Sequence, residues 1–276
     1  MRPIIVSVGP LANSSANNIA TSQTPPAAGA VAATITAGNA SIVVANTAVA
    51  GDIVTFTSTG IFPANIYPNT NYYVSATGLS SAHLQVSGNF GGAVIVPGTG
   101  GTGTPSVVFT TNPGLNGSLV NSYGVVVLDT PRRILITTTD TTTKFTINGT
   151  SPSGSLLTET FVVAGGATYS VLDYATVTSI TTNQQPTAAL TIGTNGVASS
   201  PWARLDEWAN TQVTIQCDVS GNCNYTVQSS MDDPNSIYGT AVAPAAMTWI
   251  ASNDLTVVGA TTAQQSNWFL RRYSRA

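Results

Sequence analysis

The side chains best suited to acid–base chemistry are two pairs of adjacent carboxylates, Asp206 with Glu207 and Asp232 with Asp233. Neighbouring side chains of a strand point to opposite faces, so adjacent carboxylates do not converge on one substrate. Residues 231–235 read MDDPN, which favours a turn whose Asp and Asn side chains bond nearby backbone amides. The alternating acidic residues of a calcium loop are absent. We therefore predict no catalytic residues and no enzyme.

His83 is the one histidine, and it lies in the strand-like run HLQVS, so no Ser-His-Asp or Cys-His arrangement is indicated. A zinc site needs at least three suitable ligands. The candidates Cys217, Cys223 and His83 are scattered over two expected domains. The sequence therefore predicts neither a metal nor a cofactor.

Residues 213–227 predict a β-hairpin that turns at 220–222. A three-residue turn would place Cys217 opposite Tyr225 and leave the two sulfurs as diagonal neighbours at roughly 7 Å, which is marginal for a disulfide. Two free, half-buried thiols are favoured over a disulfide.

The glycine run PGTGGTGTP at 97–105 lacks the Lys-Ser/Thr ending and the following helix of a phosphate loop, so we expect a flexible hairpin tip. Arg132 and Arg133 begin the run RRILITTT, and strand alternation sends one of them inward. The inward arginine needs a carboxylate such as Asp129 or Asp173. A buried ion pair is favoured here over a contact with a partner.

The C-terminal run NWFLRRYSRA combines aromatic residues with three arginines, the residue types enriched at interface hot spots. We expect an intersubunit anchor over 266–276; packing on its own domain as a last strand is the main alternative, and RNA binding the minor one. The candidate interface residues are Trp268, Phe269, Arg271, Arg272, Tyr273 and Arg275.

Charged residues make up 7% of the 276 residues, against roughly 25% in an average soluble domain. The formal net charge of −3 and the single lysine, Lys144, give no electrostatic footprint for nucleic acid or an anionic membrane. No apolar stretch approaches the roughly 18 residues that span a bilayer. The opening MRPIIVSVGP is expected to be a strand or docking arm of the mature protein, since Gly9 and Pro10 interrupt its apolar run.

Short alternating runs rich in Val, Ile, Thr, Tyr and Phe recur between turn signals, and helical periodicity is nearly absent. We expect hairpin turns at 139–144 and 165–167. The pattern predicts an all-β protein of two β-sandwich units, Ig-like or jelly-roll-like, with little or no helix. The expected strands are 33–37, 41–45, 52–59, 71–77, 83–87, 93–96, 106–111, 132–138, 144–149, 159–165, 175–182 and 188–193.

The chain opens with MRPIIVSVGPLA, and further along it contains VVVLDTPRRILITTT, FTINGTSPSG, IGTNGVASSPWARLD and VSGNCNYTVQSSMDDP. These segments resemble a family of tailed-bacteriophage structural proteins. The run GDIVTFTSTG, followed by PNTNYYVSA and HLQVS, resembles a module common in phage tail and fibre proteins. The resemblance implies a virion component with an insertion. We therefore divide the chain into an N-terminal arm completing the second unit (1–30), an inserted β module (31–112), a main β-sandwich (113–230) and a C-terminal extension or anchor (231–276).

Two functions from different classes follow. The first is a non-catalytic subunit of a phage particle (capsid decoration, fibre-like or tail-associated) that binds itself and other virion proteins and assembles in the host cytoplasm. Exposed sheet edges are normally guarded by charges, and between Arg2 and Asp129 the only one is Asp52. The second is a module that binds carbohydrate on a cell surface through aromatic stacking. Its candidate residues are Trp202, Trp208, Trp249, Trp268, Tyr72 and Tyr73.

Overall fold

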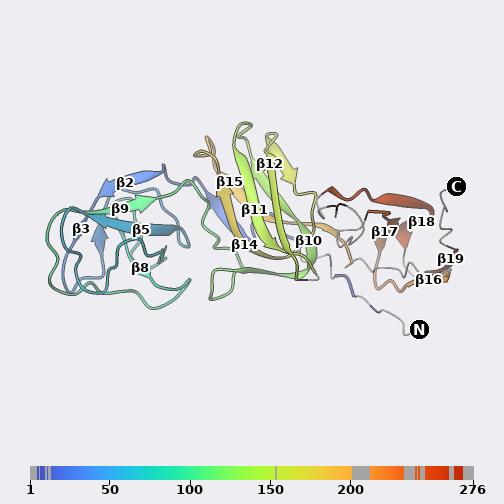
Figure 1. Ribbon diagram of the computed structural model, residues 1–276, viewed down its shortest axis with the longest axis horizontal. Coiled ribbons are helices and arrows are strands. Elements are labelled where there is room, and N and C mark those ends of the chain that lie inside the picture. The colour runs from blue at the N-terminus through green and yellow to red at the C-terminus, as the bar shows by residue number, and fades with distance from the viewer. Residues whose placement is uncertain are drawn as a thin grey trace. The chain divides into compact units, whose positions relative to one another are not determined.

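Figure 1 shows the computed structural model of the chain, which is all-β, as the sequence predicts. The structure describes residues 5, 7–9, 11, 14–152, 154–200, 212–232, 240, 242, 246–260 and 264–269, with backbone alone at 212–216, 252–260 and 264–269. No helix among these residues is long and apolar enough to cross a membrane. The chain divides into two compact units, Met1–Pro201 and Trp202–Ala276. This division lies at residue 201, whereas the sequence led us to expect a boundary near 230.

Residues 29–109 of the first unit form two antiparallel sheets. The larger has the order β2-β9-β5-β6-β8 and the smaller the order β3-β4-β7. Apolar side chains of both sheets form one hydrophobic core, in which Phe56 and Tyr72 pack edge to face with ring centroids 5.4 Å apart. The strands are β2 (Gly29–Ala32), β3 (Thr34–Ile35), β4 (Ile42–Val43), β5 (Ile53–Ser58), β6 (Tyr72–Val74), β7 (His83–Leu84), β8 (Val86–Ser87) and β9 (Pro105–Phe109). The expected strand at 93–96 is reduced to a single bridge between Ser87 and Val94.

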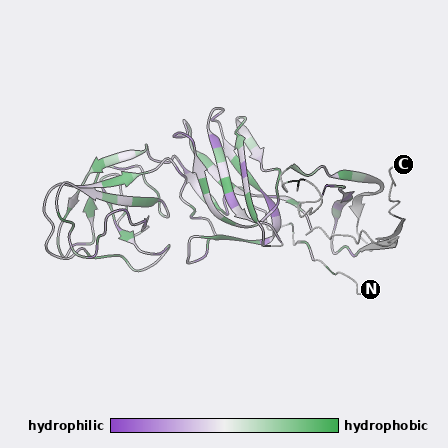
Figure 2. Ribbon diagram, in the orientation of Figure 1, coloured by the Kyte–Doolittle hydropathy of each residue, from purple (hydrophilic) through white to green (hydrophobic). Residues whose placement is uncertain are grey.

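The rest of the first unit is a seven-stranded antiparallel sheet with the order β1-β15-β10-β14-β11-β12, to which β13 adds by pairing with β10. Figure 2 shows hydrophobic and hydrophilic positions alternating along these strands, the pattern of strands with one buried face. The strands are β1 (Ala20–Gln23), β10 (Val126–Thr138), β11 (Lys144–Thr150), β12 (Leu156–Val162), β13 (Gly166–Tyr169), β14 (Tyr174–Thr182) and β15 (Leu190–Ala198).

Strand β10 links the two halves of this sheet. Val126 and Val127 pair with β14, whereas residues 135–138 pair with both β15 and β13. The register shifts between Val127 and Arg132, where Pro131 has no N–H to donate to a ladder. This irregularity lets one long strand serve both halves.

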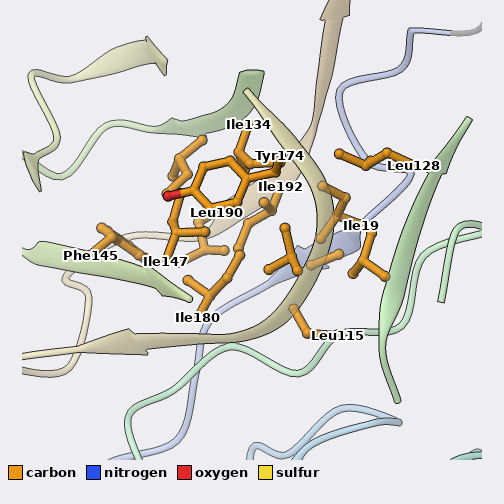
Figure 3. Close-up of a cluster of buried hydrophobic side chains, with 14 of the residues drawn as sticks. Ile19, Leu115, Leu128, Ile134, Phe145, Ile147, Tyr174, Ile180, Leu190 and Ile192 are labelled. Carbon is orange, nitrogen blue, oxygen red and sulfur yellow. The ribbon is translucent and has the colours of Figure 1, made fainter. Parts of the chain in front are cut away.

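The core of the seven-stranded sheet gathers side chains from β1, β10, β11, β12, β14 and β15, from the loop after β9 and from Ile19 before β1; Figure 3 shows part of it. Tyr174, Phe145 and Ile147 are fully buried in it, as is Ile19, which precedes β1. Residues 14–17 lie so close to Gly193 that a Cβ there would stand 2.0 Å from the Ser15 carbonyl oxygen. The N-terminal segment therefore supplies part of the core and an edge strand of this sheet.

The two predicted hairpin turns are wrong. β10 and β11 flank the turn at 139–143 but are not neighbours, because β14 lies between them. The Asp140 carboxylate in this turn accepts hydrogen bonds from Thr142 N (2.6 Å), Thr143 N (3.1 Å) and Thr187 N (2.8 Å). The first two bonds lie within the turn, and the bond from Thr187 ties the turn to the segment before β15. Likewise β13, after the turn at 165–167, pairs with β10 and not with β12.

The described part of the second unit contains two strand pairs. β16 (Gln212–Cys217) pairs with β19 (Gln264–Phe269), and β17 (Cys223–Ser229) pairs with β18 (Ile250–Ala260). The predicted cysteine hairpin is therefore wrong in its pairing. The chain does bend at Gly221, with a φ of 93°, but β16 and β17 belong to different sheets. Each finds its partner in the C-terminal segment, which alternation within 213–227 could not reveal.

The ends of the 29–109 module are adjacent, because Gly29 and Phe109 are cross-strand partners. The flanking chain is also joined: Gln23 bonds both the N–H and the carbonyl of Gly114, at 2.9 and 2.8 Å. Deleting residues 29–109 and linking Ala28 to Thr110 should therefore leave a folded protein, since insertions succeed at close ends. Circular dichroism and a cooperative thermal transition measure this. A variant without cooperative unfolding would show that the module is integral to the unit.

Candidate functional site

The predicted acid–base candidates do not form a site in the described residues. Asp206, Glu207 and Asp233 lie outside them. Asp232 accepts a hydrogen bond from the Thr248 N–H at 2.6 Å, and its own N–H donates to the Ser230 hydroxyl at 3.1 Å; the rest of the predicted turn, 233–235, lies outside the described residues. No group of three or more His, Cys, Asp or Glu side chains that could hold a metal occurs in the described part of the chain.

His83 lies exposed in β7, with its Nδ1 3.4 Å from the Ser80 hydroxyl oxygen. That hydroxyl oxygen also accepts the backbone N–H groups of Ala82 and His83, at 3.4 and 3.1 Å. The contact therefore belongs to a local turn in which a serine side chain caps the backbone. This capping role explains the position of Ser80 beside His83, so the contact does not indicate catalysis.

The glycine run at 97–105 is joined to residues 61–64 by backbone hydrogen bonds, and it is not the expected hairpin tip, because β8 and β9 on either side of it are not neighbours in the sheet. Gly98 N donates to Ala64 O at 2.8 Å and Thr102 N to Ile61 O at 2.7 Å. Gly60 and Gly103 lie in such close contact that a Cβ on Gly103 would stand 2.5 Å from Gly60 N. Beside the run is an uncharged hollow of about 220 Å³, lined by Ile61, Pro63, Thr99 and Thr102 among others.

Arg132 forms the ion pair with Asp129 that the sequence favours, with the arginine buried and 26% of the Asp129 side chain exposed. Its side chain is 0% exposed, and its Nε and Nη2 donate to the two carboxylate oxygens of Asp129, both at 2.9 Å. Its Nη1 donates to the carbonyls of Leu11 (3.2 Å) and Asn195 (3.0 Å). One guanidinium thus joins the irregular part of β10 to the N-terminal segment and to β15, a structural role.

Asp52 is another buried charged residue, 3% exposed, as Arg132 and Asp140 are also buried. It precedes β5, and a Cβ on Gly114 would stand 2.5 Å from its Oδ1, so it lies where the 29–109 module meets the flanking chain. Its Oδ2 accepts the Val49 N–H at 2.9 Å. Burial raises the pKa of Asp52 to about 7, and the backbone amides of Val49 and Gly114 oppose this only in part.

Both cysteines are free and half-buried, as the sequence favoured. Burial raises the pKa of the Cys217 thiol, while a hydrogen bond with the Tyr225 side chain lowers it and the nearby Cys223 and Asp218 raise it further. The Cys217 thiol therefore resembles a small packed side chain more than a reactive nucleophile.

A reductant should accordingly leave the melting temperature unchanged, because there is no disulfide to break. Cys217→Ser and Cys223→Ser should each destabilise by about 1–2 kcal/mol, since a hydroxyl replaces a packed thiol. Thermal melts with and without reductant measure both effects, with Ser220→Ala in the exposed turn as the control. A melting temperature that falls on reduction would show that the two sulfurs are bonded.

Of the predicted C-terminal interface, the structure describes the backbone of Trp268 and Phe269. Both lie in β19, opposite Val213 and Gln212 of β16. The backbone of 264–269 therefore forms a strand that pairs within its own unit, which was the main alternative to the anchor. Arg271, Arg272, Tyr273 and Arg275 lie outside the described residues. The interface role of these side chains stays a prediction.

The candidate aromatic residues for carbohydrate stacking differ in how exposed they are. Tyr72 is 2% exposed and its hydroxyl accepts the Tyr67 N–H, so it is a core residue. Tyr73 packs edge to face on Phe90, with ring centroids 6.1 Å apart. Trp249 is 38% exposed. The side chains of Trp202, Trp208 and Trp268 lie outside the described residues.

The strongest surface feature in the described first unit is one that sequence reasoning missed, the outer edge of β12. The sequence led us to place this strand at 159–165, three residues late. The alternation that marks its exposed face is Leu156, Thr158, Thr160 and Val162, all exposed. The run LLTETFV shows this alternation, but the apolar pair at 162–163 drew the expected strand toward its C-terminal end.

Comparison with known proteins adds no relative: no family model, no curated protein and no solved structure matches this chain.

Proposed function

We propose that this chain is a non-catalytic structural subunit of a bacteriophage particle: a capsid decoration, fibre-like or tail-associated protein. In this proposal it multimerises through sheet edges and its C-terminal segment, and it binds other virion proteins. The resemblance of its segments to tailed-phage structural proteins names the class of particle. The support from the molecule itself is physical and concerns charge.

The observation that carries the proposal is the uncharged surface of the 29–109 module. Asp52 is the one Asp, Glu, Lys or Arg in that range, and it is buried. An edge strand without charges offers unpaired backbone groups to any other strand, and soluble proteins guard such edges with charged side chains, above all lysine. A chain that omits the guards is suited to a permanent assembly in which other subunits cover its edges.

Sedimentation velocity of the purified protein tests the assembly, and we expect species larger than a monomer at micromolar concentration. A stable monomer over that range would count against the proposal. A glycan array tests the competing carbohydrate-binding function. The observations that favour this function are the exposed Trp249 and the hollow beside residues 97–105. Reproducible, competable binding to one glycan class would favour that function instead.

A further inference from the structure

The outer edge of β12 carries backbone groups that the described sheet does not use. β12 is the last strand of its sheet and pairs with β11 alone, over the register Lys144↔Val162 to Thr150↔Leu156. No other strand in the described part of the chain pairs with it. Seven residues of strand therefore present one open side.

Two hydrogen bonds at the ends of this ladder show which groups face outward. Ser151 N donates to Ser155 O at 2.8 Å, and Val163 N donates to Thr143 O at 3.3 Å. Hydrogen-bonded and non-hydrogen-bonded pairs alternate along an antiparallel ladder. The odd-numbered residues of β12 therefore bond to β11. The N–H and C=O groups that point away from β11 belong to Leu156, Thr158, Thr160 and Val162.

The side chains at this edge do not guard it. Leu156 is 87% exposed and Val162 47%, and the two residues between them on that face are threonines. The one charge of the strand, Glu159, is engaged: its two oxygens accept the N–H groups of Val171 and Leu172, at 2.7 and 3.0 Å. The strand contains no lysine and no proline, the residues that usually protect an edge.

We propose that the open edge of β12 pairs with the β12 edge of a second copy of this chain, antiparallel and about a two-fold axis. This inference rests on the proposed structural function and names the surface that performs it. Antiparallel pairing of a strand with itself is self-complementary, as a two-fold interface requires. A register centred on Thr160 pairs Thr158 with Val162 and sets Glu159 opposite Phe161. It thereby avoids two facing carboxylates, which would be destabilising.

The size of the contact sets its strength. A seven-residue strand pairing buries less than the roughly 1,200–2,000 Å² of a standard stable interface. Isolated copies should therefore associate weakly. Many copies held on one particle would make the same contact durable, because each further pairing becomes intramolecular.

Two matched lysine variants test the edge. Thr160 and Thr146 are cross-strand partners whose hydroxyl oxygens are 2.8 Å apart, so Thr160→Lys and Thr146→Lys remove the same contact and add the same charge to the same face. Only residue 160 lies on the open edge. A third variant, Thr160→Pro, removes an N–H that the ladder with β11 does not use, and proline is tolerated at such positions.

Sedimentation velocity from about 1 to 100 µM gives the dissociation constant of self-association. We expect Thr160→Lys and Thr160→Pro to raise it at least about tenfold, and Thr146→Lys to leave it within about threefold. Equal effects of the two lysine variants, or none from either variant at 160, would overturn the edge inference and leave the proposed function standing if the unaltered protein still associates. A monomeric unaltered protein would overturn the edge inference, and whether the chain belongs to a particle would then be decided by its presence in purified particles.

Discussion

Replacing Arg132 with methionine should destabilise the protein by about 3–5 kcal/mol, the cost of breaking a buried ion pair by removing one partner. The guanidinium is fully buried and donates to Asp129, Leu11 and Asn195. Methionine fills part of the volume but satisfies neither carboxylate nor carbonyl. Chemical denaturation, read by tyrosine and tryptophan fluorescence, measures the free energy of unfolding.

The double variant Arg132→Met with Asp129→Asn provides the matched test of the pairing. If the ion pair carries the effect, the double variant should lose clearly less stability than the sum of the two single changes. Arg133→Met, at the half-buried neighbouring position, is the control and should cost about 1 kcal/mol or less. A loss below about 1 kcal/mol for Arg132→Met would contradict the structural role of this residue.

The second large effect concerns pH and Asp52. Its pKa is about 7 in the folded protein against 3.8 in a model compound, so between these values the folded state holds a proton that the unfolded state has released. Stability from this group should therefore fall as the pH rises from about 4 to 7, with the penalty complete above 7. Three pKa units correspond to on the order of 4 kcal/mol.

Asp52→Asn removes this titration, so the free energy of unfolding should become flatter between pH 4 and 8. The free energy of unfolding of the variant should equal that of the unaltered protein near pH 4 and be larger at pH 8. Burial also raises the pKa of Asp173, against the opposing effects of Ser199 and Arg133, so Asp173→Asn is the comparison that separates the two carboxyls. An unchanged pH profile in Asp52→Asn would show that this carboxyl is not titrating from a buried site.

Asp140 should act in a different pH range. Burial acts to raise its pKa, but the hydrogen bonds from Thr142, Thr187 and Thr143 prevail and hold it well below its usual value. A carboxyl with a lowered pKa stabilises the fold above its unfolded-state value, and that contribution is lost as the pH falls through the folded-state value. Stability lost as the pH falls below 4 is thus expected from Asp140, whereas stability lost as the pH rises above 4 is expected from Asp52 and Asp173.

The features that could be predicted from sequence are those fixed by local periodicity. Alternation predicted the all-β class and most strands, and it predicted that an arginine at 132–133 would turn inward to meet a carboxylate such as Asp129 or Asp173; the structure selects Asp129. The buried pair follows because a strand leaves a side chain only two directions, and an inward guanidinium must find a carboxylate.

Strand pairing could not be predicted, since it depends on which strands meet. The turn TTDTTTK has the composition of a hairpin, yet β14 lies between β10 and β11, and Asp140 of the turn bonds Thr187, forty-seven residues further along the chain. Asp52 stands where a polar residue ordinarily begins a surface strand. Asp52 is buried because Gly114, sixty-two residues further along the chain, packs against it. A local sequence pattern cannot predict so distant a contact.

The most direct measurement of the central proposal is the location of the chain in the lysate where it is naturally made. Particles separated on a density gradient and washed in high salt should retain the chain, and quantitative mass spectrometry should find it in many copies per particle. Retention in salt is expected because an interface nearly free of charges is not weakened by screening. A chain that stays with the soluble proteins at the top of the gradient would contradict a structural role in the particle.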